Sequence, residues 1–239
     1  MMLRDKLKDE KYFKEYIYSL TNRIARFEEI TQKVVAEKGI KDIGALNGLT
    51  TLQGFYINMI LAKYSAGESI EDIKRYITKL IDISLQFEKN PMYSVLLDIL
   101  SLLEMIPLEN EKKNAFLKFI SKEYSDDFLI NTLVTKTYST KNVLFPESYA
   151  ALKEVVDLAN DNQKEKATQR LKTYLDKEWY KGHSDTGWYN SHKSKHNIYT
   201  GYWSFESGAL AKILGLDDTL LKDQKYYPYD MVHWQGQYS

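Results

Sequence analysis

Apolar residues in the first part of the chain recur at steps of three and four, with charged residues between them. This spacing places the apolar side chains on one face and predicts an amphipathic helix from Leu3 to about Lys38. Gly39 follows directly and is of the residue type that most often ends a helix. The apolar positions are Leu7, Phe13, Ile17, Leu20, Ile24, Phe27, Ile30 and Val34.

The next segment, residues 43–62, carries no charge and is long enough to span a bilayer. It also contains Gly44-xxx-Gly48, a spacing that allows close helix contacts. Five amide and hydroxyl side chains argue against a membrane span, because they would be costly in hydrocarbon. These are Asn47, Thr50, Thr51, Gln53 and Asn58. We expect a central helix that packs on several sides.

Helix-start signals mark the later segments. Ser69 precedes two acidic residues and is typical of an N-cap, and Ser125 precedes two aspartates in the same way. Pro91 and Pro146 suit the first position of a helix. The expected helices span residues 70–89, 93–106, 111–122, 125–138, 146–158, 165–180 and 199–214, the last of which ends at Gly215.

No segment alternates apolar and polar residues with a period of two. The sequence therefore predicts an all-α protein, a two-part bundle of antiparallel helical hairpins with essentially no sheet. The least periodic stretch covers residues 139–145, and we place a domain boundary there. The predicted domains are residues 1–140 and 141–239.

Composition narrows the possible chemistry. The 239 residues include no cysteine, which excludes disulfides, a cysteine nucleophile and a cysteine-ligated zinc site. The 33 Lys and Arg residues balance 33 Asp and Glu residues, and this balance argues against a dedicated nucleic-acid binder. The cations of the first eight residues are followed by no apolar segment of the kind that signal peptides have, so we expect a cytoplasmic protein.

Three of the four histidines, His183, His192 and His196, lie close together in the sequence. With Asp185 they could form a metal site, and a metal-dependent hydrolase is one alternative that the sequence leaves open. The pattern lacks the glutamate of a zincin motif, and the Gly, Ser and Asn content of the segment favours a loop. We expect no metal and no cofactor.

Paired carboxylates near the C-terminus are the second chemical candidate, but each has a structural interpretation. Asp217 precedes a short apolar run and is expected to cap it, with Asp218 in its first turn. Glu206 is expected on the same helix as Tyr202 and Trp203, held by a tyrosine hydroxyl or a tryptophan N–H. No phosphate-binding glycine loop and no hydrolase serine elbow occurs.

Several C-terminal strings resemble the signature of the PoNi-type immunity proteins. They are Tyr199-Thr200-Gly201-Tyr202-Trp203-Ser204-Phe205-Glu206, Leu216-Asp217-Asp218 and Tyr227-Pro228-Tyr229-Asp230-Met231-Val232, with Trp179-Tyr180, Trp188-Tyr189 and His192 upstream. Residues 64–69 resemble the companion N-terminal domain of that family. The resemblance covers about residues 3–234.

This resemblance implies a helical antitoxin that binds and inhibits a PoNe-type DNase, a toxin delivered between bacteria by secretion systems. The producer and its kin would thereby be protected. No enzyme activity, no direct nucleic-acid binding and no membrane partner are implied. A helical adaptor with an unrelated protein partner is a further alternative, and the sequence leaves the oligomeric state open.

A protein that competes with DNA for a nuclease should present carboxylates and hydrogen-bonding aromatic rings. The candidate toxin-binding residues are Glu68, Asp185, Asp217, Asp218, Asp223, Tyr226, Tyr227, Asp230 and Trp234. Signature residues should chiefly maintain the shared fold, because partner choice has to rest on positions that vary. The residues expected to be structural are Trp179, Tyr199, Gly201, Tyr202, Trp203, Phe205, Glu206, Pro228 and Tyr229.

Overall fold

The computed structural model describes the chain except for residues 1, 88–90, 121–123, 125, 138–141 and 237–239. Helices and short helical turns make up its secondary structure, and the described residues contain no strand, only an isolated β-bridge between Asp127 and Asn142. The predicted all-α fold is thereby confirmed. Packing divides the chain into two compact units. The first unit comprises Met1–Val95 and Asn190–Tyr202, and the second comprises Leu96–Tyr189 and Trp203–Ser239.

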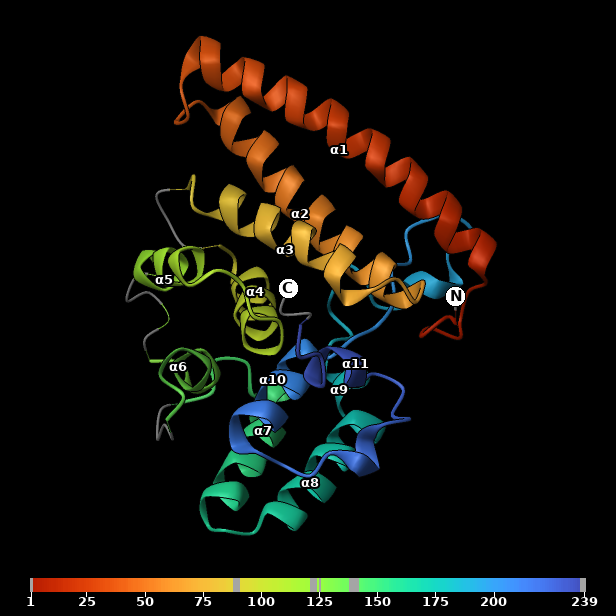
Figure 1. The fold of residues 1–239 in the computed structure, drawn as a ribbon, viewed down its shortest axis with the longest axis vertical. Helices are drawn as coiled ribbons and strands as arrows, with labels where there is room; N and C mark the ends of the chain where they lie inside the picture. The colour runs from red at the N-terminus through yellow and green to blue at the C-terminus, as the bar shows by residue number, and fades with distance from the viewer. Residues whose placement is uncertain (1, 88–90, 121–123, 125, 138–141, 237–239) are drawn as a thin grey trace. The chain divides into compact units, whose positions relative to one another are not determined.

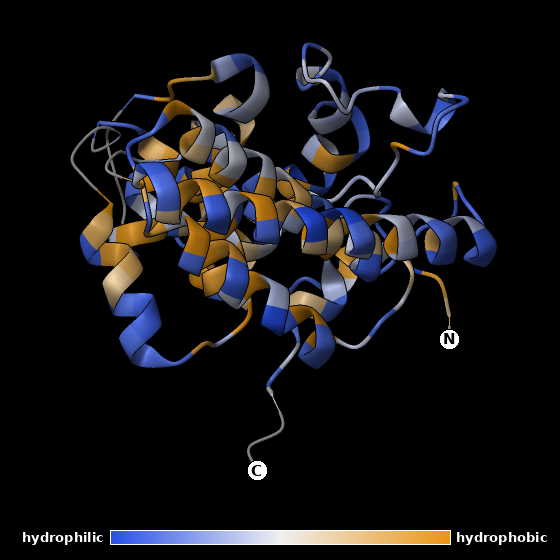
Figure 2. Cartoon of the chain, turned by 90° about the horizontal axis from the view of Figure 1, so that it is seen from above, coloured by the Kyte–Doolittle hydropathy of each residue, from blue (hydrophilic) through white to orange (hydrophobic). Residues whose placement is uncertain are grey.

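The first unit is built on α1 (Glu10–Lys38), α2 (Ile43–Ser65) and α3 (Ile70–Ser84). Figure 1 shows these helices side by side, with α2 in contact with both of the others. Hydrophobic and hydrophilic residues alternate along the helices in Figure 2, as amphipathic helices require. The buried core of this unit includes Phe13, Leu20, Ile24, Leu49, Leu52, Met59, Ile73, Ile77 and Leu80.

Helix α1 begins later than the pattern predicts. Its N-cap is Asp9, whose carboxylate accepts a hydrogen bond from the Tyr12 backbone N–H at 2.8 Å. The preceding residues are fixed differently, because the backbone N–H groups of Arg4 and Asp5 both donate to the Ser65 carbonyl oxygen. The helix ends before Gly39, which has a φ of +86°, as predicted.

The contact between α1 and α2 depends on a glycine, in agreement with the predicted close approach. A Cβ atom at Gly48 would lie 2.3 Å from Thr31 Oγ1, so a larger residue would force the two helices apart. In the described part of the chain, no helix is long and apolar enough to cross a membrane. The uncharged segment is instead explained by burial, since α2 contributes a dozen buried residues to this unit.

Helix α3 has the predicted cap: Ser69 Oγ accepts a hydrogen bond from the Asp72 N–H at 3.1 Å. It ends at Ser84, earlier than the predicted Lys89, which lies outside the described residues. The first unit also contains residues 190–202, which include a short 3-10 turn at Ser191–Lys193.

The prediction of one helix over residues 199–214 is wrong for its first six residues. Gly201 has a φ of +110°, which an α-helix does not allow. Tyr199 also exchanges hydrogen bonds with the Tyr12 hydroxyl, which donates to its carbonyl oxygen at 3.0 Å and accepts from its N–H at 2.9 Å. The helix, α10, begins only at Phe205, so Tyr202 and Trp203 do not share a helix with Glu206.

The second unit consists of shorter helices around a core that includes Leu96, Leu103, Phe116, Leu152, Leu171 and Phe205. Its helices are α4 (Tyr93–Met105), α5 (Asn110–Phe119), α6 (Phe128–Thr135), α7 (Pro146–Asn160), α8 (Lys164–Lys177), α9 (Trp179–Gly182), α10 (Phe205–Leu214) and α11 (Tyr229–Val232). The first residues of α4, up to Val95, belong to the first unit. A 3-10 turn, η3, covers Thr219–Leu221.

Pro146 opens α7 as expected. Helix α4 begins at Tyr93, where the expected span of residues 93–106 begins, and Pro91 lies before the helix and not in its first position. Helix α6 is capped by Asp127, whose Oδ1 accepts from the Ile130 N–H at 2.8 Å, and the predicted cap Ser125 lies outside the described residues. The predicted division at residues 140 and 141 differs from the division by packing and remains a prediction about family domains.

Candidate functional site

Glu206, in the first turn of α10, is the centre of a buried polar network in the second unit. Its Oε1 atom accepts hydrogen bonds from Trp179 Nε1 at 2.7 Å and from Ser204 Oγ at 2.6 Å. The expectation that a tryptophan N–H holds this carboxylate is confirmed. The donor lies 27 residues away in the sequence, beyond the reach of any local spacing rule.

A second carboxyl group lies in the electrostatic range of Glu206, and sequence reasoning missed it. Burial, together with the negative charge of Glu206, raises the pKa of Asp98 on α4 to about 8. The same surroundings raise the pKa of Tyr149, chiefly because its hydroxyl is removed from water. The signal in the sequence was a single aspartate inside the dense Leu and Ile run of residues 93–106.

Of the three clustered histidines, His183 and His192 have hydrogen-bond partners within their own units. His183 is buried, and its Nδ1 donates to the Trp179 carbonyl oxygen at 2.6 Å, which leaves Nε2 to accept from the Tyr149 hydroxyl at 3.1 Å. His192 is joined to the Tyr202 hydroxyl at 2.8 Å, and His196 is exposed. Among the described residues, no group of three or more metal-ligating side chains comes together.

Asp217 and Asp218 have different environments although they are adjacent. Asp217 is exposed, and its Oδ1 accepts from the N–H and the hydroxyl of Thr219, hydrogen bonds that lower the pKa of Asp217. Asp218 is buried, and accepts from the Tyr227 hydroxyl at 2.7 Å and from His233 Nε2 at 2.8 Å. Asp217 thus makes the expected kind of hydrogen bond to the backbone, but the N-cap residue of the turn Thr219–Leu221 is Asp218 and not Asp217. The Asp218 side chain instead holds the C-terminal segment of this unit in place.

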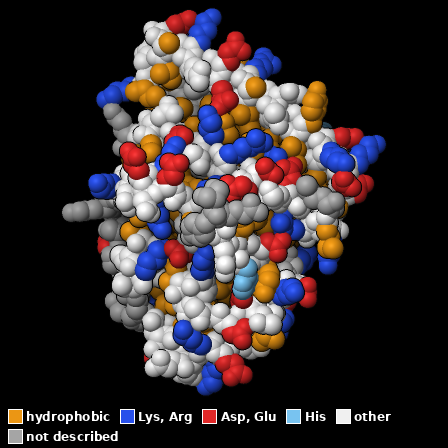
Figure 3. All heavy atoms as spheres, in the orientation of Figure 1, with side chains coloured by type: hydrophobic (Ala, Val, Ile, Leu, Met, Phe, Trp, Pro, Cys, Tyr) orange, Lys and Arg blue, Asp and Glu red, His pale blue; other side chains and the backbone are white. Residues whose placement is uncertain are grey.

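The candidate toxin-binding residues divide by exposure. In the second unit, Asp185, Asp217, Asp223 and Asp230 are exposed and Trp234 is partly exposed. Three others are buried there: Asp218, Tyr226 and Tyr227. On the face shown in Figure 3, acidic and basic side chains are interspersed, so no broad patch of one sign covers it.

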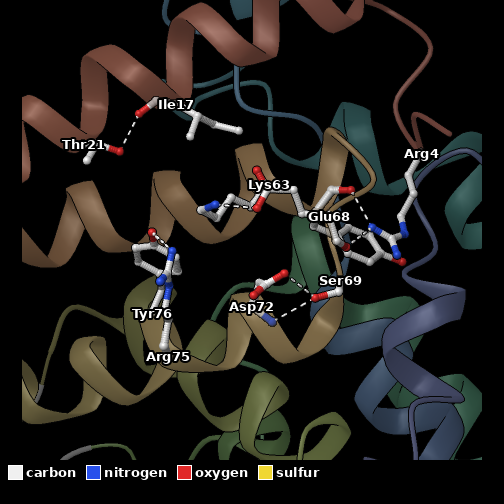
Figure 4. Close-up of polar contacts among 10 residues, drawn as sticks. Arg4, Ile17, Thr21, Lys63, Glu68, Ser69, Asp72, Arg75 and Tyr76 are labelled. Atoms are coloured by element: carbon white, nitrogen blue, oxygen red, sulfur yellow. Dashed lines mark hydrogen bonds and ion pairs between the residues drawn. The ribbon is translucent and has the colours of Figure 1, made fainter. Parts of the chain in front are cut away.

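Glu68, the one candidate in the first unit, is committed to an ion pair. Lys63 Nζ lies 2.5 Å from Glu68 Oε2, with side chains that are 7% and 23% exposed, respectively. Arg4 donates to the Glu68 carbonyl oxygen at 2.8 Å, as Figure 4 shows. Through these contacts Glu68 stabilises the turn between α2 and α3.

The residues predicted to be structural are buried, apart from the partly exposed Tyr229. Tyr199, Gly201 and Tyr202 belong to the first unit, where the Tyr199 hydroxyl donates to Asp5 Oδ2 at 2.5 Å. The others belong to the second unit: Trp179, Trp203, Phe205, Glu206, Pro228 and Tyr229. The signature therefore contributes to the interior of both units.

Two models of one protein family match this chain. The family model "PoNe immunity protein (PoNi), N-terminal" matches residues 4–117, and "PoNe immunity proteins (PoNi), C-terminal" matches residues 125–231. A search of curated proteins gave no match.

Among solved structures, the crystal structure of protein PA2201 from Pseudomonas aeruginosa is similar in fold, with a TM-score of 0.70 and 16% sequence identity. The similarity covers 96% of this chain and 89% of that one. Since the two family models together match most of its length, the chain belongs to the PoNi family of PoNe immunity proteins.

Proposed function

We propose that this chain neutralises a PoNe-type DNase by binding it directly and covering its active or DNA-binding site, without any turnover of its own. The observation that carries the proposal is the match to both PoNi family models over most of the chain. An immunity protein of this kind has to compete with DNA, a polyanion, for a basic surface.

The exposed carboxylates of the second unit supply the required charge. Asp185 and Asp223 are exposed, and neither takes part in a hydrogen bond or ion pair within the described residues. Asp217 and Asp230 are exposed as well. We assign recognition to these individual carboxylates, since the face shown in Figure 3 has charges of both signs interspersed.

Burial assigns a different role to the remaining candidates. Asp218 and Tyr227 hydrogen-bond to each other inside the second unit, and Tyr226 packs between Trp179 and Tyr180. These buried residues pack beneath the surface of the second unit and are not expected to contact the toxin themselves. Glu68 is neutralised by Lys63 and supports the first unit.

The test is a titration of DNA cleavage by the DNase encoded next to this gene. Wild-type chain should abolish cleavage at a one-to-one ratio, and the double variant D185K/D223K should require a large excess. The matched control is E29K/E37K, which makes the same charge change on exposed residues of α1. Undiminished cleavage at excess wild-type chain would overturn the proposal, and equal potency of D185K/D223K would reject these carboxylates.

A further inference from the structure

A cluster of stacked aromatic rings reaches the surface of the second unit. Tyr180, Trp188 and Tyr189 are each partly exposed. The ring centroids of Tyr180 and Tyr189 lie 4.5 Å apart at an interplanar angle of 29°, and those of Tyr180 and Trp188 lie 6.3 Å apart. We call these three residues the aromatic cluster.

Buried rings support the aromatic cluster from within. Trp188 stacks on Trp179 at 5.5 Å and 20°, and Tyr180 stacks on Tyr226 at 5.7 Å and 9°. Trp179 and Tyr226 are 4% and 8% exposed. The surface rings are therefore held against a second, buried layer of rings.

Hydrogen bonds fix that buried layer. Trp179 donates from Nε1 to Glu206, and its carbonyl oxygen accepts from His183. The Tyr226 carbonyl oxygen accepts from the Ser204 N–H at 2.8 Å. Rings that are already ordered lose little conformational entropy when a partner binds, which favours affinity.

We propose that the aromatic cluster is the anchor of the toxin interface and that Trp188 and Tyr189 receive arginine and lysine side chains of the DNase. Tyr180 stacks on both Tyr189 and Tyr226 and thereby holds the cluster in place. This inference rests on the proposed function and identifies the surface that performs it. Guanidinium groups stack on the faces of Trp and Tyr rings, and a protein surface built to hold DNA phosphates is rich in such groups. Tryptophan and tyrosine are also the residues that most often dominate binding energy at protein interfaces.

The charges around the cluster favour a basic protein over a nucleic acid. Asp185 lies in the same loop as Trp188 and Tyr189, is exposed, and has no ion pair within the described residues. The segment from Lys181 to Tyr189 carries one cation and one anion. Outside this segment, Lys225 Nζ lies 5.0 Å from the ring centroid of Tyr226. Proteins that stack single-stranded bases combine their rings with a positively charged groove, and the loop itself carries no basic excess.

The experiment measures the Kd of a catalytically inactive form of the DNase encoded next to this gene. Relative to wild type, Y189A and W188A should each weaken binding about tenfold or more, whereas Y189F should bind nearly as tightly. The control is Y18A, since Tyr18 is an exposed tyrosine of α1 in the first unit, and it should change Kd by less than about twofold. Thermal unfolding checks that each variant is folded.

If W188A does not fold, the test relies on Y189A. Trp188 stacks directly on buried Trp179, whereas Tyr189 stacks on partly exposed Tyr180, so Y189A should disturb the interior less. Tight wild-type binding that folded Y189A retains would overturn this inference alone. No wild-type binding would overturn the proposed function and this inference together. Binding of a single-stranded oligonucleotide by wild type that Y189A loses would also overturn it, because the cluster would then be a base-stacking site.

Discussion

Two glutamates, the partly exposed Glu68 in the first unit and the buried Glu206 in the second, have different partners. Glu68 in the first unit faces the ammonium group of Lys63, so a buried cation balances a largely buried anion. Glu206 in the second unit accepts from an indole N–H and a serine hydroxyl, which carry no charge. Removal from water raises the pKa of Asp98, and the negative charge of Glu206 adds to that increase.

The raised pKa of Asp98 makes the stability of the second unit depend on pH. Desolvation and the nearby charge of Glu206 both disfavour the ionised form of Asp98. Because Glu206 also orders Trp179 beneath the aromatic cluster, the same network connects stability to the proposed binding surface.

The largest effect is expected at Glu206. The substitution E206A leaves the buried Trp179 N–H without its acceptor and removes one partner of the Ser204 hydroxyl, which retains Ser207 Oγ at 2.6 Å. It should lower the free energy of unfolding by about 3 kcal/mol. The control E206Q keeps an acceptor oxygen and should cost clearly less. Urea denaturation measures the free energy of unfolding of both variants. Equal losses for E206A and E206Q would show that the acceptor oxygen of Glu206 does not stabilise the fold.

The ion pair of the first unit should come next. The substitution K63A leaves the Glu68 carboxylate largely buried without its cation and should cost about 2 kcal/mol in the free energy of unfolding. The control is K11A, which removes an exposed i,i+4 partner of Glu15 on α1 and should cost less than about 0.5 kcal/mol. Similar losses for K63A and K11A in urea denaturation would contradict the contrast between buried and exposed pairs.

A smaller effect of opposite sign is expected at Asp98. The folded-state pKa is raised to about 8 from an ordinary 3.8, so the folded state holds this proton while the unfolded chain has lost it. The contribution of Asp98 to stability therefore falls as pH rises from about 4 to 8. The variant D98N should match wild type in stability near pH 4 and should become more stable than wild type as the pH rises to 8.

Urea denaturation from pH 4 to pH 9 provides the measurement. A flatter pH profile for D98N than for wild type is the expected result. Parallel profiles would contradict a raised pKa of Asp98.

The sequence predicted features that depend on neighbours along the chain. The cap at Ser69, the helix start at Pro146 and the close approach at Gly48 all follow from local rules, and the structure has each of them. The helix over residues 199–204 was wrong because its Tyr199 backbone is held by Tyr12, 187 residues away.

The candidate site shows the same limit. Exposure separates Asp217 from Asp218 although the two are adjacent and were interpreted alike. The donor to Glu206 and the partner of Asp98 both come from distant segments, which no periodicity reveals. The aromatic cluster was visible as Tyr180 and Trp188-Tyr189, but its stacking on buried rings emerges only from the fold.

The most direct test of the central claim is a competition experiment between this chain and DNA. An inactive form of the DNase is titrated with a duplex oligonucleotide while the concentration of wild-type chain is raised. If the chain covers the DNA-binding site, the apparent Kd for DNA rises in proportion to the chain concentration. An apparent Kd that stays constant while the chain is bound, with DNase, DNA and chain in one ternary complex, would contradict it.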